Sequence, residues 1–98
     1  MSQADYDIAH LRHQGQDIII VPVEDVFENY TQDEQMELRD SLQFYAQDAD
    51  LRGTVCIVWQ RGNRLRFLAP KPWWPFFESI DMHFVRANIN RRLTCRSG

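Results

Sequence analysis

The residue types best suited to binding chemistry here are arginine and tryptophan, and they gather in one part of the sequence. The planar guanidinium of arginine makes paired hydrogen bonds to carboxylate or phosphate, and tryptophan is enriched where partner proteins bind most tightly. We therefore predict a docking surface for a partner protein, built from Trp59, Arg61, Arg64, Arg66, Trp73 and Trp74. The alternative interpretation is an ordinary solvated sheet end, on which arginine stems cover an indole.

A β-hairpin over residues 54–69 is predicted to position the first four of these side chains. Two apolar runs, 54–60 and 64–69, are separated by Arg61-Gly62-Asn63, and glycine suits the first central position of a type II′ turn. This register pairs Trp59 with Arg66 across the strands, where they can stack as a cation and a ring. Alternation assigns Trp59 and the arginines to an open face. The core face then holds Cys56, Val58, Leu65, Phe67 and Ala69.

The segment 70–77, which follows the hairpin, contains three prolines and four aromatic residues. Because proline interrupts both helix and central strand, we predict a stiff, extended crossing. Its aromatic side chains either cap one edge of the core or serve as a partly exposed anchor for the partner. Residues 54–69 together with residues 70–77 make up the predicted Arg/aromatic surface of a small protein-interaction or regulatory module.

Charge is divided unevenly along the chain. Residues 1–50 carry 12 acidic and two basic side chains, whereas residues 51–98 carry two acidic and nine basic ones. The two halves either pair internally or present an arginine-rich face to an anionic partner. The second hypothesis is therefore nucleic-acid binding, in which Arg86, Arg91 and Arg92 join the hairpin arginines. A homodimer is a further alternative.

The surrounding pattern predicts one α+β domain over residues 1–98, a two-layer α/β arrangement. We expect a small mixed sheet of about three strands with helices packed on it, in the order (α)βαββα. The first helix is predicted over 3–13, with a strand over 6–12 as the alternative. The run 17–23 is typical of a strand buried on both faces, and Pro22 should end its pairing on one side.

Two longer helices are also predicted. Thr31 and Glu34 form a capping-box pattern at the start of a helix that runs to about Ala49. A second helix is expected over 79–93, because apolar residues recur there at helical spacing. That helix has two apolar sides, of which one should face the sheet and the other the aromatic segment or a second chain.

The sequence contains no familiar catalytic or ligand-binding spacing, so an enzyme is only the third hypothesis, and we predict no catalytic residue, cofactor or metal site. His10 and His13 would make only half a metal site. Arginines around Cys95 would favour its thiolate, although no neighbouring base completes a nucleophilic site. No basic apolar leader or membrane-length apolar run is present, so we expect a cytoplasmic protein without membrane attachment.

Overall fold

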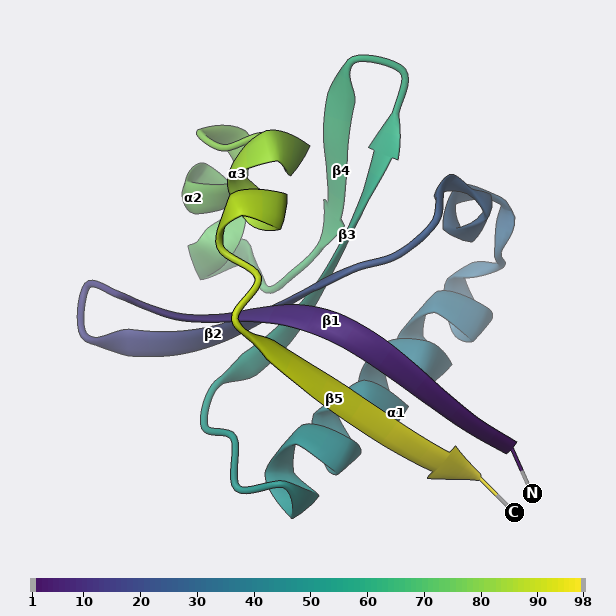
Figure 1. The fold of residues 1–98 in the computed structure, drawn as a ribbon. Helices are drawn as coiled ribbons and strands as arrows, with labels where there is room; N and C mark the ends of the chain where they lie inside the picture. Colours follow the sequence, from purple (N-terminus) through teal and green to yellow (C-terminus); the bar gives the residue numbers. More distant parts are fainter. Residues whose placement is uncertain (1, 98) are drawn as a thin grey trace.

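Within residues 2–97, which the computed structural model describes with side chains for residues 4–95, the chain forms one five-stranded sheet (Figure 1). The strands lie in the order β4-β3-β2-β1-β5; β2 and β3 run parallel, and the other neighbours run antiparallel. Their bounds are β1 Ser2–His13, β2 Gln16–Pro22, β3 Thr54–Arg61, β4 Arg64–Leu68 and β5 Arg91–Ser97.

Helices cover both faces of this sheet. On one side, named here the α1 face, lie η1 (Asp25–Asn29) and α1 (Gln32–Asp48), which connect β2 to β3. On the other side, the α3 face, lie η2 (Lys71–Trp73), α2 (Trp74–Glu78) and α3 (Met82–Ala87). The α+β class and the mixed sheet are confirmed. The prediction of about three strands in the order (α)βαββα is wrong, because the segment of β1 was expected to be a helix and no strand was predicted for β5.

β2 is the buried strand that its β-branched run predicts. Ile19 and Val21 pack on the α1 face, while Ile18 and Ile20 pack on the α3 face. All four are fully buried, since helices lie on both sides. The β1–β2 ladder stops at the pair Ala9–Ile20, before Pro22, so the predicted loss of pairing near that proline is confirmed.

α1 begins at the predicted capping box. The Thr31 N–H donates to Glu34 Oε1 (2.9 Å), and the Glu34 N–H donates to Thr31 Oγ1 (3.1 Å). The helix buries Leu42 and Ala46 against the sheet. Phe44 lies outside that stripe and is 63% exposed.

The N-terminal segment is a strand rather than the predicted helix. Gln14 (φ +52°) and Gly15 (φ +79°) form the tight turn into β2, and both positive φ values are typical of a type I′ hairpin. The alternative prediction, a strand over 6–12, is therefore the correct one, although the strand is longer at both ends. β1 is held on both sides: residues 9–13 pair with β2, and residues 2–8 pair with β5.

The predicted helix over 79–93 is also wrong beyond a short central part. Asp81 caps α3 through its side chain, which accepts from the Phe84 N–H at 2.9 Å, and the helix ends at Ala87. Asn90 then bonds to the β1 backbone: its N–H donates to Ile8 O (3.0 Å) and its side chain bonds both backbone groups of His10 (2.9 Å each). This clamp turns the chain into β5.

Candidate functional site at the β4 edge

The hairpin forms with the predicted register. Ile57 pairs with Leu68, Trp59 with Arg66 and Arg61 with Arg64, and Gly62 takes φ +60° in the turn. The predicted core face is confirmed, because it packs against α2 and α3 on the α3 face. Its members there are Cys56, Val58, Leu65, Phe67 and Ala69.

Trp59 does not lie on an open face, and that part of the prediction is wrong. Its side chain points into the α1 face, where only 4% of the residue is exposed. The ring meets Phe27 edge-on with centroids 4.8 Å apart, and the indole N–H donates to Glu28 Oε1 at 3.0 Å. The sequence missed this burial because η1, a short 3-10 helix, supplies both Phe27 and Glu28.

Glu28 also gathers two of the hairpin arginines. Arg66 Nε lies 3.4 Å from Glu28 Oε1, and Arg61 lies 3.7 Å from Glu28 Oε2. These pairs, with Arg92 and Asp7 at 3.5 Å, show internal pairing between the acidic and basic halves of the chain. Among the described residues, Arg64 has no acidic group within salt-bridge distance, so it is the free guanidinium of the hairpin.

The Pro/aromatic segment is partly helical, contrary to the predicted extended crossing. Pro72 and Pro75 occupy the first turns of η2 and α2, where a missing backbone N–H costs nothing. Trp73 is buried (7% exposed) and lies against Phe76. Trp74 is 42% exposed, and its indole N–H donates to Ala69 O at 2.8 Å. Of the two tryptophans in this segment, only Trp74 exposes its ring to solvent.

Trp74 and β4 together line a shallow groove of about 460 Å³ at the outer edge of the sheet. Its lining is Arg64, Leu65, Arg66, Phe67, Leu68, Ala69, Trp74 and Glu78. Lys71 lies beside it, with its Nζ 5.9 Å from the centre of the Trp74 ring.

The backbone of β4 has a free side in this groove. Val58 O accepts from the N–H of Val23, the residue directly after β2, so the backbone groups of Trp59 and the other odd residues of β3 point towards β4. The β4 residues opposite them, such as Arg66, direct their N–H and C=O groups towards β3. The alternate residues Leu65 and Phe67 therefore point their N–H and C=O groups away from β3, at the free edge of the sheet. The β4 edge thus offers two donors and two acceptors beside Arg64 and Trp74.

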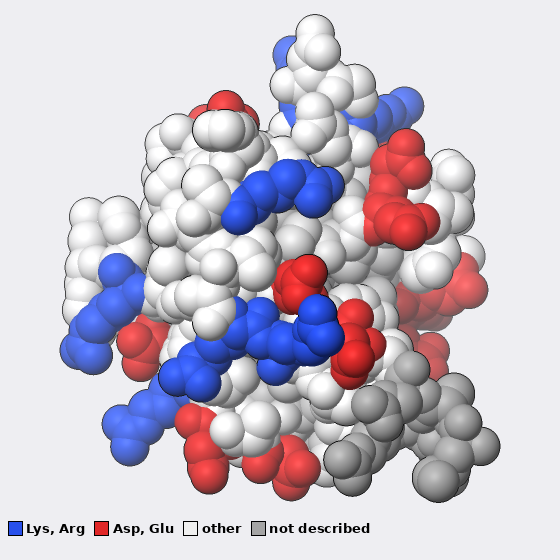
Figure 2. Space-filling model, in the orientation of Figure 1, with Lys and Arg blue, Asp and Glu red and all other residues white. Residues whose placement is uncertain are grey.

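The arginines of the nucleic-acid hypothesis are not brought together with those of the hairpin. Arg91 and Arg92 begin β5, which lies at the opposite edge of the sheet from β4. Arg86 is exposed on α3. On the face seen in Figure 2, acidic side chains lie between the basic ones, so no continuous basic surface forms there.

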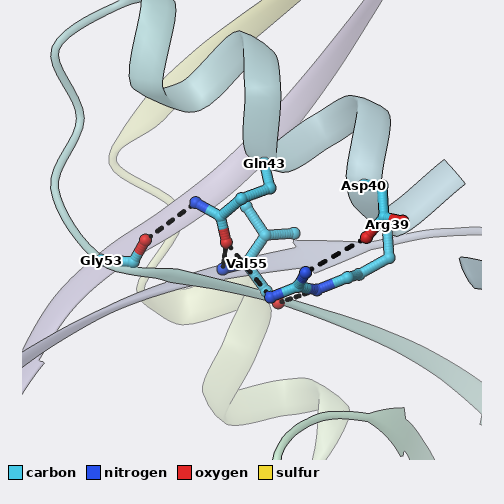
Figure 3. Close-up of polar contacts among 5 residues, drawn as sticks. All are labelled: Arg39, Asp40, Gln43, Gly53 and Val55. Atoms are coloured by element: carbon cyan, nitrogen blue, oxygen red, sulfur yellow. Dashed lines mark hydrogen bonds and ion pairs between the residues drawn. The ribbon is translucent and has the colours of Figure 1, made fainter. Parts of the chain in front are cut away.

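Sequence reasoning missed a polar clamp on the inner side of α1 (Figure 3). β4 ends opposite Ile57, which leaves the start of β3 without a neighbour on that side. Gln43 fills the gap: its amide donates to Gly53 O (3.0 Å) and its oxygen accepts from the Val55 N–H (2.8 Å). Arg39 Nε donates to Val55 O (3.4 Å), and its guanidinium also bonds Gln43 Oε1 (3.3 Å). These side chains replace a missing strand, which is a structural role.

A second cavity, of about 600 Å³, opens where β1 and β2 separate. It is lined by Asp5, Tyr6, Asp7, Pro22, Val23, Glu24, Val26, Phe27, Tyr30, Leu38, Arg86 and Ile89. Burial, with Cys95 and Tyr30 nearby, raises the pKa of Tyr6, so its phenol stays neutral and can donate a hydrogen bond. The sequence indicated only that pairing should fail near Pro22, and it did not predict a cavity there.

Neither cysteine is activated. Burial raises the pKa of the Cys56 thiol to about 12, and the positive charge of Arg39 has the opposite, smaller effect. Burial and the carboxylate of Asp5 raise the pKa of Cys95, so the expectation that nearby arginines favour its thiolate is wrong.

The two histidines face opposite sides of the sheet because they lie three apart on a strand. His10 Nε2 bonds Arg52 O at 2.7 Å, while His13 packs against Phe76 with ring centroids 4.7 Å apart. Within the described part of the chain, no group of three or more His, Cys, Asp or Glu side chains is placed to hold a metal ion. No helix in that part is long and apolar enough to cross a membrane.

Comparison of the chain with protein-family models, with curated proteins and with solved structures found no match.

Proposed function

We propose that this protein is a small cytoplasmic interaction module that binds an extended, acidic segment of a partner protein along the free edge of β4. The observation that carries the proposal is the groove in which outward backbone groups of Leu65 and Phe67 lie beside Arg64 and Trp74. An added strand would satisfy these groups, as in recognition by strand addition. Trp59 and Trp73 are buried in the core and do not line the groove, so they are not part of the proposed surface.

Charge selects the kind of partner. The basic side chains around the groove are Arg61, Arg64, Arg66 and Lys71, and Glu78 is the single acidic residue in its lining. Glu28 already neutralises part of the charge of Arg61 and Arg66, which leaves Arg64 to bind a carboxylate in a bidentate way. Half-exposed Trp74 supplies an apolar anchor of the kind that dominates binding energy.

A second copy of the chain fits this edge less well. Antiparallel addition of two identical edges, in which Leu65 of each copy pairs with Phe67 of the other, would place Arg66 of the two copies opposite each other, and like charges opposed across strands are destabilising. Edge arginines are also a common device against such self-pairing. We therefore expect a monomer in solution, and a partner whose charge is opposite to that of the edge.

The test uses a fluorescein-labelled decapeptide of alternating Glu and Val, with a Lys/Val peptide as its charge control. We expect the acidic peptide alone to raise the fluorescence anisotropy on binding. Arg64→Glu should weaken binding about tenfold, because an attraction becomes a repulsion. Arg52→Glu, which changes another exposed arginine outside the groove, should leave binding unchanged.

Three results would contradict the proposal. They are equal binding of the two peptides, equal loss in the two arginine variants, and a dimer in sedimentation that Arg64→Glu dissociates. The nucleic-acid hypothesis predicts instead that a labelled single-stranded oligonucleotide binds at low salt and that its affinity falls steeply as salt rises.

A further inference from the structure

The cavity between β1 and β2 exists because of one missing N–H. His10 turns its backbone groups towards Asn90, so the odd residues of β1 turn theirs towards β2. In β2 the even residues face β1, because the Val23 N–H bonds to β3. Continuing the ladder beyond Ala9–Ile20 would therefore oppose Asp7 to Pro22, which has no N–H to donate.

The two strands separate at this point, and the cavity of about 600 Å³ described above lies between them. This cavity is called the slot. In Figure 1, β1 turns away with β5 while the chain after β2 continues towards η1. By the same alternation, the N–H and C=O of Asp7 point into the slot from β1, whereas Pro22 contributes only its C=O from β2. Its backbone walls thus hold more acceptors than donors, and a ligand that carries donors is favoured.

The charged side chains around the slot also contain more hydrogen-bond acceptors than donors. Three carboxylates line it, Asp5, Asp7 and Glu24, against one guanidinium, Arg86. Asp5 accepts from Thr94 Oγ1 at 2.8 Å, and Asp7 lies 3.5 Å from Arg92. Glu24 precedes η1 without capping it through its side chain.

The wall on the α1 side of the slot is apolar and aromatic. It contains Tyr6, Val23, Phe27, Tyr30 and Leu38, with the rings of Phe27 and Tyr30 5.2 Å apart. Aromatic faces attract cations, and the two phenols add polar tips. The volume of about 600 Å³ falls within the range of small-molecule sites.

We propose that this slot binds a small organic cation, an ammonium group carried on an apolar or aromatic body. The ammonium has three donors and no acceptor, which matches the carboxylates and free carbonyls. The body packs on the wall at Tyr30, which is 41% exposed, and Leu38. Arg86 also lines the slot. This site is separate from the β4 groove and does not depend on the function proposed for that groove.

The test is an NMR titration of the ¹⁵N-labelled protein with phenethylammonium, with 2-phenylethanol and 3-phenylpropanoate as neutral and anionic analogues. We expect saturable shifts at Tyr6, Asp7, Val23 and Tyr30. The cation should bind about tenfold more tightly than the alcohol, since hydrogen bonds to charged groups are stronger than neutral ones. Equal affinity of the three compounds, shifts located elsewhere, or no saturable shift would overturn the proposal.

Two variants sharpen this experiment. Glu24→Gln should weaken phenethylammonium binding several-fold, whereas Asp33→Asn, which removes a carboxylate from the exposed side of α1, should have no effect. Pro22→Val restores the missing N–H, so it should extend the β1–β2 ladder, close the slot and abolish binding while the spectrum stays folded. Unchanged binding by Glu24→Gln and by a folded Pro22→Val protein would refute the site.

Discussion

Replacing Gln43 by alanine should destabilise the fold far more than its place on a helix surface indicates. The substitution removes both bonds to the start of β3, those with the Val55 N–H and with Gly53 O. It also removes the oxygen that Arg39 bonds at 3.3 Å, which loosens the third contact of the clamp. β4 does not reach this part of β3, so no neighbouring strand can replace the lost bonds.

The magnitude follows from these bonds and from burial. Each hydrogen bond contributes about 1 kcal/mol net, and a buried donor left without a partner costs about 1–3 kcal/mol. Val55 is fully buried, so water cannot easily reach its N–H. We expect a loss of about 2–3 kcal/mol in the free energy of unfolding, which for a chain of 98 residues corresponds to a fall in Tm of about 10–20 °C.

The assay is chemical and thermal unfolding followed by circular dichroism, with Gln47→Ala as the matched control. Gln47 is an exposed glutamine one turn further along α1, and both substitutions change helix propensity equally. Gln43→Glu should fall in between, because a carboxylate still accepts from the Val55 N–H but cannot donate to Gly53 O. If Gln43→Ala and Gln47→Ala are equally stable, the clamp does not hold β3 as described.

Two further predictions concern the interior. Gly53→Ala should lower the free energy of unfolding more than Gly15→Ala. At Gly53 (φ +127°) a new Cβ would lie 2.8 Å from the Asp17 backbone, whereas no atom lies within 4 Å of a new Cβ at Gly15. Equal losses of stability in urea unfolding would contradict this prediction. The pKa of Cys56 is raised from 9.0 to about 12 in the folded state, so the contribution of the neutral thiol to the free energy of unfolding should be full below pH 9 and be lost as pH rises towards 12. Cys56→Ala should make the stability of the protein depend less on pH in this range. Identical pH profiles of the two proteins would argue against this.

The features predictable from the sequence are those with local causes. The capping box of Thr31 and Glu34 involves neighbours in the chain, and the hairpin register follows from a two-residue turn. Pro22 ends a ladder wherever its N–H would be needed. In each case the physical cause lies within a few residues of its effect, so one sequence suffices to recognise it.

The features that escaped prediction depend on distant partners. β1 and β5 are strands because they pair with each other. Apolar and polar residues alternate only over short stretches in each, such as 4–8 and 92–96, which is a weak signal for a strand. Trp59 alternates as expected, but whether its face is open depends on η1, which places Phe27 over it. For the candidate site, the sequence indicated Arg64 and Trp74, whereas the free backbone of β4 became visible only with the strand order.

The position of β1 also shapes how the chain acquires its fold. β1 is synthesised before β5, yet residues 2–8 of β1 pair with β5, more than 80 residues further along the chain. A growing nascent chain can complete the hairpin of β1 and β2 at once, but half of β1 must wait for residues 91–97. Because closing so large a loop costs entropy before any contact repays it, we expect docking of β5 to be a late step in folding. Until then the waiting half of β1 remains open to chaperones and to wrong pairing.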